Sequence, residues 1–311
     1  MKKWDLRLRV DRYNQFRPNR YQTKNKIRMI YKLLSFSEHK FLNEFVYDIY
    51  RLQTTKQGVE YSTAPNGIVG ISIIMSGKSE VLVGNNWEKT PKVFIYGLIK
   101  TPDVFRISAN YTEIAIGFKP YFLQLLIKNS MSDIIQTKNM NATDIFTHTD
   151  EFYEQLCSAK SEYETLVVIE KFLLKQLNPL KTDKRLLTAM KYIYDDGITN
   201  VSELSEKLNL SSTSVRNIFR DGIGRSPKEV VTILRINNIL KSDINSFASL
   251  TELCYKNGYF DQSHFINDFR DSLGMTPSQY FNNNKLAFDF YNSGRWEGNI
   301  FEQSNLGKWK K

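Results

Sequence analysis

Apolar residues recur at every second position between residues 45 and 118, as in the run Val69, Ile71 and Ile73. A period of two is the pattern of strands that bury one face in a sheet. Turn-forming residues such as Pro65-Asn66-Gly67 separate the runs. The pattern predicts six or more short strands, which we expect to form a small barrel or sandwich. The alternating residues favour a filled, apolar interior.

Beyond this stretch the apolar residues take up a helical period. Pro120 opens an apolar helix, and two further helices are expected at about 150–158 and 161–177, the last ended by Asn178-Pro179. The third helix carries an apolar stripe that can pack either on its own β-rich domain or on a second subunit. The stripe consists of Leu166, Ile169, Leu173 and Leu177.

A pattern of about thirty residues occurs twice between Val201 and Phe281. Phe219-Arg220-Asp221 recurs as Phe269-Arg270-Asp271, and a Gly and a Pro follow at the same offsets in both copies. A shared register of this kind indicates a structural repeat and not low complexity.

Each copy predicts two short helices around a tight turn. In the first copy Ser202 caps one helix, Asn209-Leu210 turns the chain and Ser211 caps the next helix. In the second copy Ser249 and Glu252 form a capping box. Apolar residues four apart point inward from each second helix; they are Val215 and Phe219, then Phe265 and Phe269.

A further helix begins after each copy, at Pro227 and at Pro277. The first of these helices is long, reaches about Ser242 and joins the two copies. This is helix-turn-helix geometry, in which the second helix of each unit can lie in a major groove of DNA.

Two such units joined by one long helix resemble the DNA-binding domain of the AraC/XylS family of transcription regulators. The resemblance is most specific in the second copy, in Gly258-Tyr259, residues 261–265 and residues 274–277. It implies a seven-helix domain with two recognition helices in successive major grooves. Gly117-Phe118-Lys119-Pro120 is similar to a segment of some of the family's sensor domains, and implies a cupin-like effector or protein-interaction domain.

The candidates for DNA contact are recognition-helix side chains that do not face the core. Arginine suits guanine, and asparagine and glutamine suit adenine, whereas a merely solvated helix face is the alternative. The resemblance places Thr213, Arg216, Asn217, Gln262, Ser263 and Asn267 at base-facing positions. Arg220, His264 and Arg270 complete the set of candidates.

Two of these positions need comment. His264 can equally be structural, bonded to phosphate or to neighbouring backbone. Asn267 and Asp268 stand where members of the family often have basic residues, so we expect the second unit to be the weaker or less specific one.

The predicted fold class is α+β: a β-rich small barrel or sandwich with helices, then an all-α domain of two helix-turn-helix units joined by a long helix. The chain divides into five expected segments. They are a basic N-terminal arm (1–40), a β-rich regulatory domain with C-terminal helices (41–178), a linker (179–183), the DNA-binding domain (184–283) and a C-terminal tail (284–311).

The net charge of +10 does not lie in the repeat. Residues 1–40 carry 12 Lys and Arg against 3 Asp and Glu, whereas residues 182–284 carry 12 of each sign. DNA binding by the repeat must therefore depend on local placement of cations. The cations concerned are Arg216, Arg220, Arg225 and Arg270.

The arm mixes its cations with aromatic residues such as Trp4 and Tyr13. Such a mixture can stack on and neutralise nucleic acid. The alternative, which we favour, is that the arm docks on the β-rich domain, because its cations alternate with Leu6, Leu8 and Val10.

No catalytic, metal or cofactor site is expected. His39, His148 and His264 lack partners at metal-ligand spacing, and Cys157 and Cys254 are too few and too far apart for a zinc cluster. Phosphate loops and nucleophile elbows are absent from the sequence. In the β-rich domain the ligand residues stay unassigned; polar residues that flank strands are Tyr96, Arg106 and Lys119.

The helix-turn-helix repeat predicts binding to double-stranded DNA, and the resemblance to the AraC/XylS family implies a sequence-specific transcription regulator. The chain has no apolar run of roughly 18 residues and no apolar segment of a signal peptide, so we expect a cytoplasmic protein without a membrane partner. A small-molecule effector, a protein partner and a homodimer are left open, and RNA polymerase is implied by the family. The alternative function is a signalling or interaction protein that keeps the fold without binding DNA specifically.

Overall fold

The computed structural model describes most of the two predicted domains. The predicted arm up to residue 29, most of the linker and the tail from residue 284 lie outside the described residues. The structure describes residues 30–34, 46–127, 131, 139–177, 183–198, 200–240, 242, 247 and 249–282.

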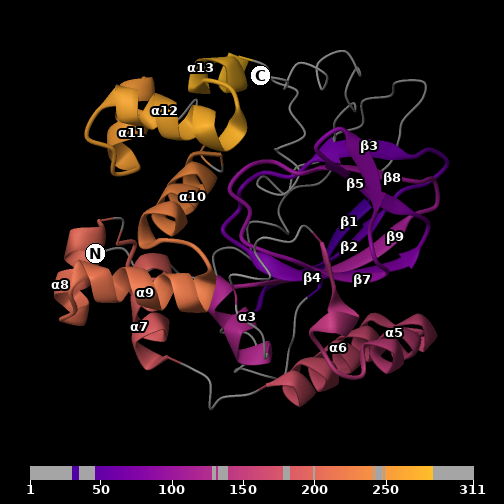
Figure 1. The fold of residues 1–311 in the computed structure, drawn as a ribbon. Coiled ribbons are helices and arrows are strands. Elements are labelled where there is room, and N and C mark those ends of the chain that lie inside the picture. Colours follow the sequence, from indigo (N-terminus) through magenta and orange to yellow (C-terminus); the bar gives the residue numbers. More distant parts are fainter. Residues whose placement is uncertain are drawn as a thin grey trace.

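The N-terminal part contains two antiparallel sheets packed face to face (Figure 1). One sheet has the order β1 (Ile30–Leu34), β2 (Val46–Gln53), β9 (Thr112–Phe118), β4 (Val69–Ser76), β7 (Val93–Tyr96) and β10 (Met140–Asn141). The other has the order β3 (Val59–Ser62), β8 (Val104–Ile107), β5 (Ser79–Val83) and β6 (Asn86–Lys89). Of the two expected shapes, the sandwich is the observed one, and the α+β class is confirmed.

The larger sheet is buried on both faces. Val69, Ile71 and Ile73 share an apolar cluster with the helices that cover the sheet. Ile74 points the other way and shares a cluster with Phe105 of the second sheet. The interior is filled, as expected, but the alternating run that suggested this faces the helices instead. Alternation cannot say which face is interior when both are buried.

The three helices expected after the strands are confirmed as α3 (Pro120–Leu126), α5 (Thr149–Ser158) and α6 (Glu162–Gln176). A 3₁₀ turn, η1 (Ala142–Asp144), precedes α5. In α6 the stripe residues Ile169 and Leu173 are fully buried in the chain's own core. Of the two alternatives left open for the stripe, its centre therefore packs on its own domain.

Strand β1 lies inside the predicted basic arm. It pairs antiparallel with β2, with Ile30 opposite Gln53 and Leu34 opposite Ile49. Residues 30–34 therefore belong to the sheet, and the docking of residues 1–29 stays a prediction. A run of five residues is too short to show a period, so the sequence pattern does not predict this strand.

Seven helices lie between residues 183 and 282, the number that the family resemblance implies. Figure 1 shows α10 running from the first helix-turn-helix unit to the second. The helices are α7 (Lys184–Tyr194), α8 (Val201–Leu208), α9 (Ser212–Ile223), α10 (Pro227–Leu240), α11 (Leu250–Lys256), α12 (Gln262–Leu273) and α13 (Pro277–Asn282).

Helix caps explain where the helices of each unit begin. The side chain of Ser211 accepts from the backbone of Ser214 and caps α9, and Ser249 caps α11 in the same way, as predicted. The prediction that Ser202 caps α8 is wrong. Asn200 occupies the cap and accepts from the backbone N–H of Ser202. Asparagine is as good a cap as serine, so the helix starts at the earlier of the two.

The loop between β3 and β4 packs against the C-terminal helices. Asn237 Nδ2 of α10 donates to the carbonyl oxygen of Asn66 at 2.8 Å, and Tyr194 Oη of α7 donates to that of Gly67 at 2.6 Å. Gly67 has a φ of 73°, which favours glycine. Ala64 lies in the apolar cluster of the second helix-turn-helix unit. The sandwich is therefore fastened to the helix that joins the two units.

Candidate DNA-binding surface

The recognition helices α9 and α12 each bury one face and expose the other. Val215 and Phe219 of α9 are fully buried, as are Phe265 and Phe269 of α12, which confirms the inward pairs expected from the repeat. Phe265 and Phe269 also contact each other edge to face, with centroids 5.8 Å apart. These anchors fix which residues of each helix point to solvent.

All four candidates of α9 are exposed: Thr213, Arg216, Asn217 and Arg220. Arg220 Nη2 donates to Asn217 Oδ1 at 3.2 Å, and its Nε lies 3.5 Å from Asp221 Oδ1. Within the described part of the chain, Arg216 has no hydrogen-bond or ion-pair partner. Its guanidinium therefore keeps its full set of donors for a ligand.

Four of the five candidates of α12 are exposed, and His264 is half buried. Its ring meets that of Tyr259 edge to face at 5.4 Å, and its Nε2 lies 3.5 Å from Asp268 Oδ2. The position of His264 thus fits the structural alternative. The exposed candidates of α12 are Gln262, Ser263, Asn267 and Arg270.

Asp268 faces the protein and not the exposed side of α12. Its side chain is 17% exposed, and its Oδ2 accepts from the Thr232 hydroxyl of α10 at 3.4 Å. The nearby Tyr259 ring lies under the guanidinium of Arg235 at 5.0 Å. Burial raises the pKa of the Tyr259 hydroxyl, so it stays protonated. These contacts hold α12 on α10.

The two recognition helices differ in charge. Helix α9 carries two arginines and one aspartate, whereas α12 carries one arginine and two aspartates. The cap of α12 is a further carboxylate, Asp261, whose Oδ1 accepts from the His264 backbone at 2.7 Å. The first unit is therefore the better electrostatic match for a phosphate backbone.

Arg225 is directed at the sandwich. Its Nε and Nη2 both lie 3.3 Å from the carbonyl oxygen of Leu98, and its Nη1 lies 3.8 Å from Glu229 Oε1. Beside it, Gly222 of α9 packs so closely that an added Cβ would crowd Gln124 of α3. The expectation that Arg225 helps to bind DNA does not fit this placement, and we leave it out of the candidates.

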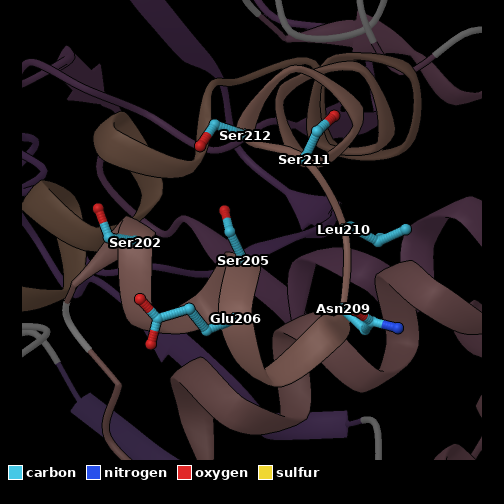
Figure 2. Close-up of a pocket in the computed structure, with 7 residues that line it drawn as sticks. All are labelled: Ser202, Ser205, Glu206, Asn209, Leu210, Ser211 and Ser212. Atoms are coloured by element: carbon cyan, nitrogen blue, oxygen red, sulfur yellow. The ribbon is translucent and has the colours of Figure 1, made fainter.

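A polar depression of about 390 Å³ lies between α8 and the start of α9 (Figure 2). Ser211 and Ser212, at the start of α9, are exposed at its edge. The depression lies beside the first turn of a recognition helix. Helix-turn-helix proteins contact the DNA backbone in this region. The depression is lined by Ser202, Ser205, Glu206, Asn209, Leu210, Ser211 and Ser212.

The sandwich interior holds a carboxyl group that the sequence analysis did not single out. Glu113 of β9 is 4% exposed and accepts hydrogen bonds from the hydroxyls of Ser72 and Tyr111, the latter at 2.6 Å. Burial raises the pKa of Glu113, although both hydrogen bonds act in the opposite direction. Burial therefore favours the neutral acid, whereas the two hydrogen bonds favour the carboxylate.

The three polar residues that flank strands make three different contacts. Arg106 pairs with Glu80 at 2.6 Å on the surface. Lys119 lies 3.5 Å from Asp195, at the end of α7. The ring of Tyr96 packs over Gly70, where an added Cβ would collide with it. They do not converge on a common site.

The described residues hold neither a cluster of metal-ligand side chains nor a membrane-spanning helix. Within them, no three His, Cys, Asp or Glu side chains cluster as a metal site would require. No helix in the same residues is long and apolar enough to cross a membrane.

Comparisons of sequence support the C-terminal motif. Residues 204–283 match the family described as a helix-turn-helix domain. An uncharacterized HTH-type transcriptional regulator of Haemophilus influenzae is 29% identical over 100 residues, 32% of this chain and 34% of that protein. The melibiose operon regulatory protein of Escherichia coli K12 is 25% identical over 87 residues, 28% of each chain. The matches span about a third or less of these relatives.

Solved structures with some likeness cover more of the chain. ToxT from Vibrio cholerae has 13% identity and a TM-score of 0.40, over 75% of this chain and 96% of that one. CuxR, an AraC-like transcriptional activator, has 15% identity and a TM-score of 0.29, over 61% of this chain and 80% of that one. Similarities of this size assign no ligand or partner.

Proposed function

We propose that this chain is a transcription regulator of the AraC type that binds double-stranded DNA at specific sequences. The match of residues 204–283 to a helix-turn-helix domain supports the proposal. The observation that carries the proposal is the pair of recognition helices, each anchored by two buried residues and each exposing a polar face. The alternative, an interaction protein of the same fold, gives no reason for two such faces in the two units that α10 joins.

We assign the base contacts to the exposed side chains near the start and middle of each recognition helix. Arg216 binds guanine O6 and N7 through its unpaired guanidinium, and Asn217, Gln262 and Asn267 suit adenine. Thr213 and Ser263 supply hydroxyls to either base type.

The remaining candidates act on the backbone or on the protein. Arg220 and Arg270 lie in the last turns of their helices and contact phosphates. His264 positions α12 through Tyr259 and Asp268. The weaker charge of α12 supports the expectation that the second unit binds less tightly.

The sandwich is the proposed regulatory domain, which responds to a small-molecule effector or a protein partner. What supports this is its contact with both units: α3 packs beside α9, and the β3–β4 loop packs on α10. A change of shape in the sandwich would reach both recognition helices through these contacts. RNA polymerase, which the family resemblance implies, and a homodimer complete the proposed partners. The proposed location is the cytoplasm.

Selection of duplexes from random DNA by the full chain tests the proposal. We expect an enriched sequence with two segments about 10 base pairs apart, since the two recognition helices enter successive major grooves on one face. Hydroxyl-radical footprints should show the same two segments. If no sequence is enriched, the interaction protein becomes the better account.

A further inference from the structure

Phe260 is the most solvent-exposed of the large apolar side chains in the described part of the chain. It is 85% exposed, and the next two are Tyr163 at 64% and Tyr255 at 58%. A phenylalanine left in water forgoes the free energy that burying its ring would release. Single exposed apolar side chains are common on protein surfaces. Phe260 is distinguished from the others by its place directly before a recognition helix.

The backbone on both sides of Phe260 is fixed. Before it, Gly258 has a φ of 76° and Tyr259 is buried. After it, Asp261 caps α12, and its carbonyl oxygen accepts from Cys254 Sγ at 3.3 Å. Phe260 therefore lies in a turn whose neighbours on both sides are buried or hydrogen-bonded.

This turn lies at the DNA-facing end of the second unit. Phe260 stands two residues before Gln262 and three before Ser263, the base-facing candidates at the start of α12. In helix-turn-helix proteins the N-terminal end of the recognition helix contacts base edges in the major groove. When α12 lies in a groove, DNA is therefore the partner nearest to Phe260.

The chemistry of the second unit favours an apolar contact. Helix α12 carries more aspartate than arginine, and the cap Asp261 adds a further carboxylate beside Phe260. Electrostatic attraction to DNA is weak here. Among the bases, thymine is the one that shows an apolar group in the major groove, its C5-methyl, and phenylalanine is one of the side chains that contact it.

We propose that Phe260 packs on the C5-methyl group of a thymine in the half-site of the second unit, and so contributes to sequence preference there. The proposal rests on the proposed function. Gln262 and Ser263 read polar base edges next to it, and Phe260 adds the apolar contact that the second unit lacks.

Replacing thymine by uracil tests this directly, because uracil lacks only the methyl group. In the duplex enriched by the full chain, each thymine of the second half-site is replaced in turn. At one position we expect the affinity of the wild-type chain to fall about fourfold, the equivalent of burying one methyl group. The Phe260→Ala variant should bind the thymine duplex as weakly as the wild type binds the uracil duplex, and show no further loss with uracil.

Tyr163→Ala, which removes an exposed aromatic ring from α6, is the matched control and should keep the uracil effect. Because Phe260 is exposed, its alanine variant should melt at the wild-type temperature. If uracil has no effect at any position, or if Phe260→Ala keeps the effect, Phe260 does not contact a thymine methyl. If no sequence is enriched at all, the proposed function fails, and this inference with it.

Discussion

Arg216 and Arg220 lie one turn apart on the exposed face of α9, but only one of them is already engaged. Arg220 is bonded to Asn217 and lies close to Asp221, whereas Arg216 has no partner among the described residues. An arginine without an intramolecular partner breaks no hydrogen bond or ion pair of its own when its guanidinium binds a base. The two residues should therefore respond differently to truncation.

We expect Arg216→Ala to lose about 1 to 3 kcal/mol of discrimination at one base pair, with the fold intact. Arg220→Ala should instead weaken binding to all sequences alike and reduce the salt slope by about 1. Competition binding with single-base variants of the enriched duplex measures both effects. Lys171→Ala, at an exposed position of α6, is the control. An unchanged base preference for Arg216→Ala would contradict its assignment.

Glu113 predicts a pH dependence of stability. Its folded pKa is raised above the ordinary value of 4.5, so the folded chain keeps the proton to a higher pH than the unfolded chain does. The stability linked to this group is complete below the unfolded pKa and is lost as pH rises through the folded pKa. We expect the melting temperature to fall over this window in the wild type, and this part of the fall to be absent in Glu113→Gln.

Melting curves recorded from pH 4 upward measure the effect. Glu88→Gln, on the exposed strand β6, is the matched control and should follow the wild type. Parallel pH profiles for Glu113→Gln and the wild type would show that folding does not raise the pKa of Glu113.

Individual residues were predictable where the local chain decides their role. The inward Val215 and Phe219, and the caps Ser211 and Ser249, follow from spacing within one unit. Glu113 could not be found in this way, because its burial depends on a second sheet that covers its strand. Phe260 was missed because a pattern of apolar residues predicts burial, and here the apolar residue is exposed.

At the scale of elements, the β3–β4 loop and α10 form one contact across 171 positions of sequence, from Asn66 to Asn237. Asn237 is buried in the middle of a helix, where asparagine is a poor helix former. The hydrogen bond to the loop accounts for this residue. The contact ties the position of α10 to that of the sandwich.

Asn237→Ala should destabilise the chain by about 1 to 3 kcal/mol, because it leaves the buried carbonyl of Asn66 without its donor. The neighbouring Asn238, exposed on the same helix, offers a control: Asn238→Ala should change the melting temperature little. Calorimetry of the two variants checks this. Equal melting temperatures for both would mean that the loop contact adds nothing to stability.

Among the elements, those with caps and long periods were the predictable ones. The helices α3, α5 and α6 and the repeated helices follow from apolar spacing and from Ser, Asn and Pro at their starts. The strands β3 and β8 have four residues each and were not identified individually, because so short a run shows little alternation. These residues form strands because they pair with neighbouring strands, and no local sequence pattern reveals that pairing.

For the whole molecule, the open question is where its positive charge acts. Of the twelve Lys and Arg in residues 1–40, ten precede β1. Strand β1 itself is fixed to β2, so deleting all forty residues would also remove an edge strand. Deleting residues 1–29 separates the charge from the strand.

We expect the chain without residues 1–29 to keep the salt slope of the wild type, since we favour docking of the arm on the sandwich. The chain without residues 1–40 should in addition melt at a lower temperature, because it loses the β1–β2 ladder. Each phosphate contact contributes about −0.9 to the slope of log affinity against log salt concentration. A slope that flattens by several units without residues 1–29 would instead place the arm on DNA.

Ala64 packs in the apolar cluster of the second helix-turn-helix unit. This contact limits the hybrids that can be made by joining the DNA-binding domain to a different sensor domain. A hybrid that joined residues 184–283 to another sensor would leave uncovered the part of α10 that the β3–β4 loop now shields. Arg225 would also lose the carbonyl of Leu98. The two halves are therefore not interchangeable cassettes, and a transplant of this DNA-binding domain would have to carry residues 63–68, or a copy of their shape, along with it.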